Sequence, residues 1–298
     1  MITNAKCSEE KRDSMRAYGG QVIVAKDGLP ADHPEHYVNL EATLVERHKG
    51  EGYFGVDQYE NLDNPEAYYQ TLGPEIWRQT EGAVTHFVAG GSTGGTVSGT
   101  GRYLKDKSGG KVRVLLPDPV GSVLLGAFHN PGSDQAEGAP QGGKPHAPLE
   151  EGVLAAGKYA VEGVGKDSVP GTMAFEHVDA VLSVTDKQAV DMCLRMAHEE
   201  GVLAGGSSGL NVHGAVELSA RVPAGSVIVT VLPDTGLKYL SKIYNKEWRE
   251  SKGLDGGPAG TAAAAADKQA GASAARQAAG FKLAGAPQDT DPLAPLLK

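Results

Sequence analysis

The sequence has few cysteines and no long apolar run, and these absences narrow the classes of protein that it can encode. Its 298 residues contain only two cysteines, Cys7 and Cys193. Two thiols so far apart favour a reducing compartment over a disulfide framework, so we expect a cytoplasmic protein. No apolar stretch approaches the roughly 20 residues that cross a bilayer, and no apolar signal core follows Met1. We therefore expect no membrane association.

Positive charge is also scarce. The chain has 28 Lys and Arg against 37 Asp and Glu, which gives a net charge of −9. A surface that binds nucleic acid needs clustered Lys and Arg, so we expect no nucleic-acid partner. Neither cysteine has a Cys or His nearby at the spacing of metal ligands, so we expect no metal site.

Strand-like runs alternate with helical patterns along most of the chain. We expect strands at residues 21–25, 53–56, 84–89, 112–116, 178–184 and 227–232. We expect helices at residues 8–18, 38–49, 185–200 and 237–250, and further helices after two glycine-rich turns. We also expect helices to begin after Asn64-Pro65 and at Pro74. This alternation predicts an α/β fold in which helices cover a mostly parallel sheet.

Two segments differ in composition from the rest. Residues 129–152 are rich in Gly, Pro, Ala and Gln and predict a flexible insertion. Residues 253–298 have a similar bias and almost nothing to bury, so we expect a mostly disordered tail.

The most informative stretch runs from residue 83 to residue 105, where a short apolar run leads through a glycine-rich turn into a helical pattern. Unpaired N–H groups and the helix dipole at such a turn favour an anion, most naturally a phosphate. The hydroxyls of Ser92, Thr93 and Thr96 supply further donors. A glycine linker is the simplest alternative. The turn lacks the Gly-Lys-Ser/Thr ending of a Walker loop. Its glycines also depart from the G-x-G-x-x-G spacing of a dinucleotide-binding turn, so that interpretation fits poorly but stays possible.

Two more turns rich in Gly, Ser or Thr follow strand-like runs, at residues 204–209 and 234–236. Five segments together resemble the β-family of pyridoxal 5′-phosphate (PLP) enzymes, which comprises cysteine synthases and cystathionine β-synthases. They are FGVDQYENLDNPEAYYQTLGPEIW, STGGTVSGTGRYLK, VEGVGKDSVP, EEGVLAGGSSG and VLPDTGLKYLSKIYNKEW. Their order and spacing follow the family over most of residues 8–249.

The resemblance implies PLP as cofactor and a site built from all three turns. The loop that holds the cofactor phosphate is matched by Thr93, Gly94, Gly95 and Thr96, preceded by Ser92 where the family usually has Gly. Ser207 matches the serine that hydrogen-bonds the pyridine nitrogen, and Gln58 matches the glutamine that contacts the substrate carboxylate. A neutral hydroxyl at the ring nitrogen favours elimination over transamination. We assign no role to Lys166, whose position is often aromatic or acidic in the family.

The resemblance also implies a domain organisation and an activity. Residues 1–60 match part of a small substrate domain, and residues 61–252 match the large PLP-binding domain of a family whose members are often homodimers. Details such as EGVGKDSVP favour cystathionine synthesis from serine and homocysteine, with cysteine synthase as the runner-up. The lysine that forms the Schiff base with PLP matches no residue of this sequence, and Lys6 is not that lysine. We therefore expect no catalytic residue in the chain as given, and a non-catalytic partner of an intact relative is a third possibility.

Overall fold

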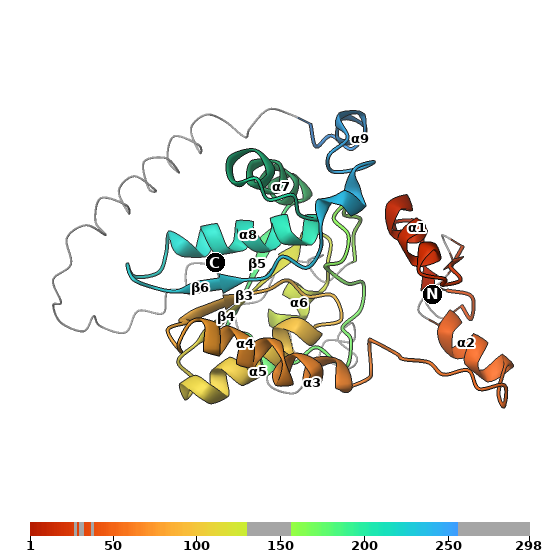
Figure 1. The fold of residues 1–298 in the computed structure, drawn as a ribbon, viewed down its shortest axis with the longest axis horizontal. Coiled ribbons are helices and arrows are strands. Elements are labelled where there is room, and N and C mark those ends of the chain that lie inside the picture. Colours follow the sequence, from red (N-terminus) through yellow and green to blue (C-terminus); the bar gives the residue numbers. More distant parts are fainter. Residues whose placement is uncertain (27–28, 30–32, 37–38, 130–155, 256–298) are drawn as a thin grey trace.

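A four-stranded parallel sheet forms the centre of the molecule in this computed structural model, which describes residues 1–26, 29, 33–36, 39–129 and 156–255 (Figure 1). Its order is β5 (Ala180–Val184), β4 (Arg113–Pro119), β3 (His86–Val88) and β6 (Ile228–Thr230), and all neighbours run parallel. The expected α/β fold with a parallel sheet is confirmed.

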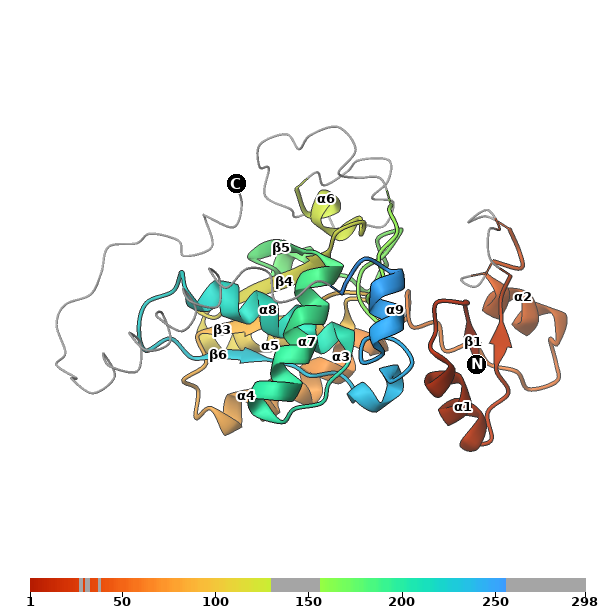
Figure 2. The ribbon, with the colours of Figure 1, turned by 90° about the horizontal axis from the view of Figure 1, so that it is seen from above.

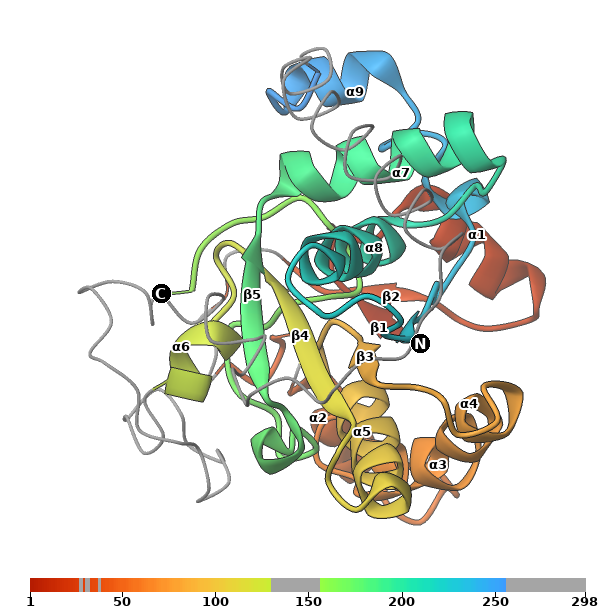
Figure 3. The same ribbon diagram turned by 90° about the vertical axis from the view of Figure 1, so that its left-hand side faces the viewer.

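Helices cover both faces of this sheet, as Figure 3 shows. One face carries α3 (Asp63–Gln70), α4 (Leu72–Gln79) and α5 (Gly95–Ser108). The opposite face carries α7 (Asp186–Glu200) and α8 (Gly206–Ser219). The short helix α6 (Leu124–His129) lies beside β5.

Alternate residues of the strands face the two helical layers. Phe87 pairs in register with Val114, and both belong to the cluster that includes Val97 and Leu104 of α5. The next residues along, Val88 and Leu115, also pair, and they pack with Leu218 of α8. Because successive side chains of a strand point to opposite faces, the strands are apolar on both sides, as expected for a covered parallel sheet.

A smaller N-terminal unit lies to one side of this body (Figures 1 and 2). It consists of β1 (Ile2–Thr3), α1 (Glu9–Ala17), β2 (Ile23–Val24) and α2 (Leu40–Arg47). Its two short strands pair in parallel. Neither α1 nor α2 contains a buried residue, so apolar packing contributes little to this unit.

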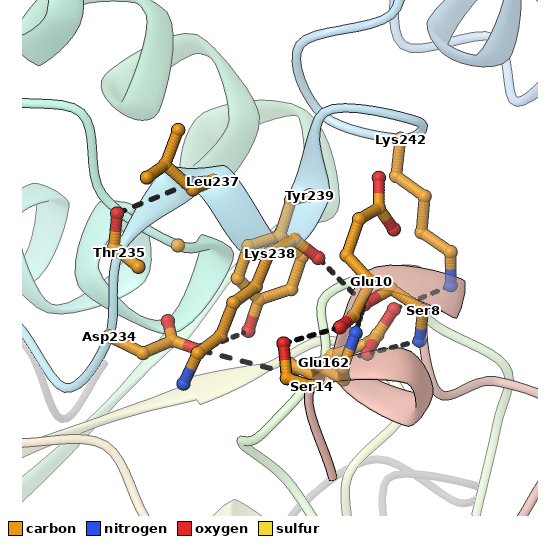
Figure 4. Close-up of polar contacts among 12 residues, drawn as sticks. Ser8, Glu10, Ser14, Glu162, Asp234, Thr235, Leu237, Lys238, Tyr239 and Lys242 are labelled. Carbon is orange, nitrogen blue, oxygen red and sulfur yellow. Dashed lines mark hydrogen bonds and ion pairs between the residues drawn. The ribbon is translucent and has the colours of Figure 1, made fainter. Parts of the chain in front are cut away.

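Polar contacts around Glu162 join α1 to the body (Figure 4). The Glu162 carboxylate accepts from Lys11 Nζ at 3.3 Å and from Lys242 Nζ at 2.5 Å. Ser8 donates its hydroxyl to the carbonyl oxygen of Lys238 at 2.6 Å, and its N–H points to Glu162 at 3.3 Å. These four side chains and Ser8 N–H form a single network, which we call the Glu162 cluster (Ser8, Lys11, Glu162 and Lys242).

The helix expected at residues 185–200 is confirmed in detail. Thr185 and Gln188 form a reciprocal capping box at its start, and Gly201 ends it with a left-handed φ of 68°. Local sequence alone determines both ends of this helix.

Two expected elements are wrong. Residues 53–56 form no strand, and Phe54 is 82% exposed, because no neighbouring strand pairs with this segment. The helix expected at residues 237–250 is instead a short 3₁₀ helix, η3 (Gly236–Tyr239), followed after a break by α9 (Lys246–Ser251). The Asn245 side chain accepts from Trp248 N–H and starts α9 afresh.

Several expected boundaries move. Pro65 and Pro74 each occupy the third position of their helices, still inside the first turn, where a missing N–H costs nothing. Strand β4 continues through Asp118 to Pro119, beyond the expected end of the strand at residue 116. Strand β6 is shorter and only half buried, because it lies at an edge of the described sheet.

The two compositionally biased segments fall almost wholly outside the described residues. His129 ends α6, whereas residues 130–152 of the expected insertion are not described. Leu254 is buried against the body, so the fold extends slightly past the expected start of the tail at residue 253. Within the described part of the chain, no helix has the length and apolarity needed to cross a membrane.

Candidate cofactor site

The glycine-rich turn connects the end of β3 to the start of α5. Gly94 precedes the helix in a left-handed conformation with φ of 88°. A Cβ on Gly94 would lie 2.8 Å from Met173 Cα, and a Cβ on Gly95 would overlap the Asn64 side chain. Gly99, one turn later, leaves room in the same way for the carbonyl oxygen of Pro65. Close packing of α3 and Met173 against this turn therefore requires these glycines, independently of any ligand.

The backbone of the turn offers donors at the positive end of a helix of 14 residues. Among the described residues, no acceptor pairs with the N–H groups of Ser92, Thr93 and Thr96, and the three residues are partly exposed. Unpaired N–H groups at a helix N-terminus favour an anion. The turn therefore fits a phosphate by its own geometry.

Asn64 links the turn to the segment that contains Gln58. Its amide Nδ2 donates to the Thr93 hydroxyl at 3.0 Å and to the carbonyl oxygen of Gln58 at 2.7 Å. The Thr93 hydroxyl also accepts from Gly95 N–H at 3.4 Å. Gln58 itself is exposed. The structure thus brings Gln58 to the glycine-rich turn through Asn64, which the sequence indicated only as the start of a helix.

A second asparagine joins the turn to α8. The N–H of Gly90 donates to Asn211 Oδ1 at 2.7 Å, and Asn211 Nδ2 donates to the carbonyl oxygen of Val231 at 2.9 Å. Asn211 lies one helical turn after Ser207, which is 4% exposed in the first turn of α8. The carboxyl ends of β3 and β6 and the beginning of α8 therefore meet at one edge of the sheet, where α/β proteins bind ligands.

The loop at residues 161–166 reaches the same edge. Gly165 N–H donates to the carbonyl oxygen of Gly91 at 2.6 Å. Lys166 is 5% exposed, and its Nζ lies 3.3 Å from Asp167 Oδ1 and 4.2 Å from the centre of the Tyr59 ring. The buried ammonium of Lys166 thus lies between this loop and Tyr59, the residue that follows Gln58. No local pattern in the sequence indicates this placement.

A buried carboxyl lies at the end of β4. Asp118 is 1% exposed, and its Oδ2 accepts from Leu125 N–H at 2.9 Å. Its Oδ1 has no partner among the described residues. Burial raises the pKa of Asp118 to about 7, because hydrogen bonds from Ser122 and from Leu125 N–H offset only part of the lost hydration.

Comparison with known proteins identifies the class. Residues 1–234 match the sequence model of the family described as pyridoxal-phosphate dependent enzyme. The chain therefore belongs to this family, whose members use PLP.

Individual relatives agree with that assignment. The chain is 33% identical to cysteine synthase 1 of Neurospora crassa over 84% of its own length and 61% of the relative's. It is 34% identical to the O-acetylserine dependent cystathionine beta-synthase of Bacillus subtilis, with coverages of 79% and 66%. The chain thus spans less than two thirds of the length of these curated relatives.

Solved structures share the fold. The O-acetylserine dependent cystathionine beta-synthase of Helicobacter pylori superposes with a TM-score of 0.65 and 31% identity, over 82% of this chain and 69% of that one. An O-ureido-L-serine synthase gives a TM-score of 0.66 and 26% identity, with coverages of 87% and 70%.

Proposed function

We propose that this chain supplies the cofactor-binding part of a PLP-dependent β-replacement enzyme. The observation that carries the proposal is the meeting of three segments at one sheet edge: the turn at residues 90–96, the loop at residues 161–166 and the start of α8. We further propose the domain boundaries after residues 60 and 252, a homodimer and a cytoplasmic location.

The cofactor phosphate would lie on the turn formed by Ser92, Thr93, Gly94, Gly95 and Thr96. The unpaired N–H groups of this turn donate to the phosphate, and the dipole of α5 favours its charge. The Thr93 hydroxyl already accepts from Asn64 and Gly95, so its own hydrogen is left to donate to the anion.

Ser207 would donate its hydroxyl to the pyridine nitrogen. PLP supplies an electron sink for the substrate's α-carbon, and a neutral partner at the ring nitrogen limits how strongly that sink draws electrons. The next residue, Ser208, is fully buried, and its hydroxyl has no partner among the described residues. Ser207→Ala should therefore alter the absorbance spectrum of bound PLP and weaken binding several-fold, whereas Ser208→Ala should change neither. Equal behaviour of the two variants would contradict the role of Ser207.

Gln58 would contact the carboxylate of the amino-acid substrate. The hydrogen bond from Asn64 to its carbonyl oxygen fixes the backbone of Gln58 beside the phosphate turn, and its exposed side chain stays free to reach a ligand. We expect Gln58→Ala to weaken binding of serine while PLP binding is unchanged.

We propose serine and homocysteine as substrates and cystathionine as product. The relative named cystathionine beta-synthase supports cystathionine as the product, and relatives named cysteine synthase support the runner-up, which makes cysteine. The relative named O-acetylserine dependent cystathionine beta-synthase supports O-acetylserine as the alternative to serine. The test supplies PLP with serine or O-acetylserine as one substrate and homocysteine or sulfide as the other, and measures products by mass spectrometry. Cystathionine supports the proposal, and cysteine from sulfide alone supports the runner-up. Because no lysine of this sequence matches the Schiff-base lysine, we expect the chain as given to form neither product, and the product test applies to a chain that carries that lysine. Co-purification with an active relative supports the non-catalytic partner.

A further inference from the structure

A cavity of about 760 Å³ lies between the N-terminal unit, the loop at residues 157–167 and the C-terminal end of the body. This size suits a small-molecule ligand. The cavity shares Gly165 and Lys166 with the loop of the candidate cofactor site, but the turn at residues 90–96 and Ser207 lie outside it, so the proposed function assigns no ligand to this space.

Positive charge dominates the walls of this cavity. Five lysines line it: Lys6, Lys158, Lys166, Lys242 and Lys252. Only two carboxylates do, Asp167 and Asp186. Asp186 already accepts from the N–H groups of Ala160 and Val161, at 2.6 and 2.9 Å. Lys166 pairs with Asp167 and Lys242 with Glu162, so the excess positive charge of the walls comes from Lys6, Lys158 and Lys252. In a chain with a net charge of −9 this local excess indicates a site for an anion.

Of the five lining lysines, Lys6 is the one whose buried charge is least compensated. Its Nζ lies 3.7 Å from the centre of the Tyr159 ring, and no carboxylate of the described residues lies within ion-pair distance. Burial lowers the pKa of Lys6 to about 8. Nearby Asp186 and Glu162 oppose this shift, whereas Lys242 and Lys11 add to it. The ammonium is thus desolvated without full compensation, a cost that a bound anion would remove.

We propose that this cavity binds a small phosphorylated molecule, with Lys6 as its central cationic contact. A lysine ammonium binds phosphate as a point charge, and Lys252 at the rim adds to the field. Tyr159 and Trp248 line the same space, so a ligand that carries a ring gains aromatic contacts there. This proposal does not depend on PLP binding at the turn.

The first test is calorimetric titration of the full chain with inorganic pyrophosphate, at constant ionic strength. The turn at residues 90–96 also offers N–H donors to phosphate, so binding in the cavity is the binding whose affinity responds to Lys6. We expect Lys6→Met to weaken binding at least tenfold and Lys252→Met several-fold. Lys246→Met is the matched control. Lys246 lies in α9, the helix that directly precedes Lys252 in the chain, but it pairs with Glu250 and does not line the cavity. Equal affinity of wild type and Lys6→Met, or an equal loss in Lys246→Met, would overturn the proposal.

A second test is specific to the proton of Lys6 and excludes a simple folding defect. Inorganic sulfate does not titrate near neutrality, so its binding should weaken as the pH rises through about 8 and Lys6 loses its charge. At pH 8, binding to wild type should take up a proton, measured as a buffer-dependent heat, whereas Lys6→Met should show none. A pH-independent affinity in wild type would rule out Lys6 as the contact.

Discussion

The body and the N-terminal unit are stabilised in different ways. In the body, Phe87, Leu115 and Leu116 are fully buried between two helical layers. In the N-terminal unit, the helices α1 and α2 bury no residue, and α1 is attached by the Glu162 cluster and by hydrogen bonds from Ser241 to the Glu10 carboxylate. Apolar burial therefore determines the stability of the body, and a few polar contacts determine the position of the N-terminal unit. The comparison predicts global effects for changes in the first region and local effects for changes in the second.

The largest effect is expected in the core of the body. Leu116→Ala removes a fully buried side chain from the middle of β4 and should lower the free energy of unfolding by about 3 kcal/mol. Leu232→Ala is the control, because Leu232 is 45% exposed, and it should change the value by less than about 0.5 kcal/mol. Urea denaturation followed by circular dichroism measures both. Similar losses in the two variants would show that burial does not govern the body.

Asp118 should make the body more stable in mild acid. Its folded pKa of about 7 lies above its unfolded value of 3.8, so the folded state holds the proton between these pH values. The stability it contributes is therefore fully present below about pH 3.8 and is lost as the pH rises to about 7, with on the order of 3 kcal/mol of this loss above pH 5. Asp118→Asn should remove this loss. Exposed Asp13→Asn should leave the pH dependence of unfolding unchanged, and an unchanged profile in Asp118→Asn would contradict the assignment.

Breaking the Glu162 cluster should release α1 without unfolding the body. Glu162→Gln leaves Lys242 without its carboxylate and Lys11 with only Asp234, at 4.0 Å. The expected cost is about 2 kcal/mol, since both lysines are partly exposed. Amide exchange in α1 should accelerate about 30-fold while exchange in β3 and β4 stays unchanged. The control is Glu199→Gln, which breaks an exposed pair with Arg195 in α7. Equal acceleration in the body would contradict the local role of the cluster.

The smallest effect is expected at the cap of α7. Thr185→Ala removes the side chain that accepts from Gln188 N–H and should cost about 1 kcal/mol of global stability. Ser183→Ala, at an exposed position two residues earlier, should cost much less. Thermal unfolding of the two variants measures the difference, and no difference would show that the cap is dispensable.

The elements that sequence analysis predicted correctly carry their own local signals. Thr185, Gln188 and Gly201 define both ends of α7, whatever lies around it. Residues 53–56 have strand-forming side chains but form no strand, because no strand of the described residues lies beside them. Strand pairing depends on the tertiary fold, so the local sequence does not predict it. Asn245 breaks an otherwise helical pattern because its side chain competes for the backbone.

The candidate site divides in the same way. The glycine-rich turn is visible in the sequence because it combines glycines, hydroxyls and a strand before a helix. The roles of Asn64 and Asn211 are not visible in the sequence. The hydrogen bond between Asn64 and Thr93 spans 29 residues, and the one between Gly90 and Asn211 spans 121 residues. Such long-range side-chain bridges depend on how helices pack, and they assemble the site.

The central claim is that the turn at residues 90–96 holds the phosphate of PLP. The most direct measurement compares the dissociation constants of PLP and pyridoxal, which lacks the phosphate, for the full chain and for Thr93→Val. The account predicts that PLP binds the wild type more than about tenfold tighter than pyridoxal, because several N–H donors bind a charged group. In Thr93→Val this advantage should shrink, with pyridoxal binding unchanged. Equal affinities of the wild-type chain for PLP and pyridoxal would contradict the account.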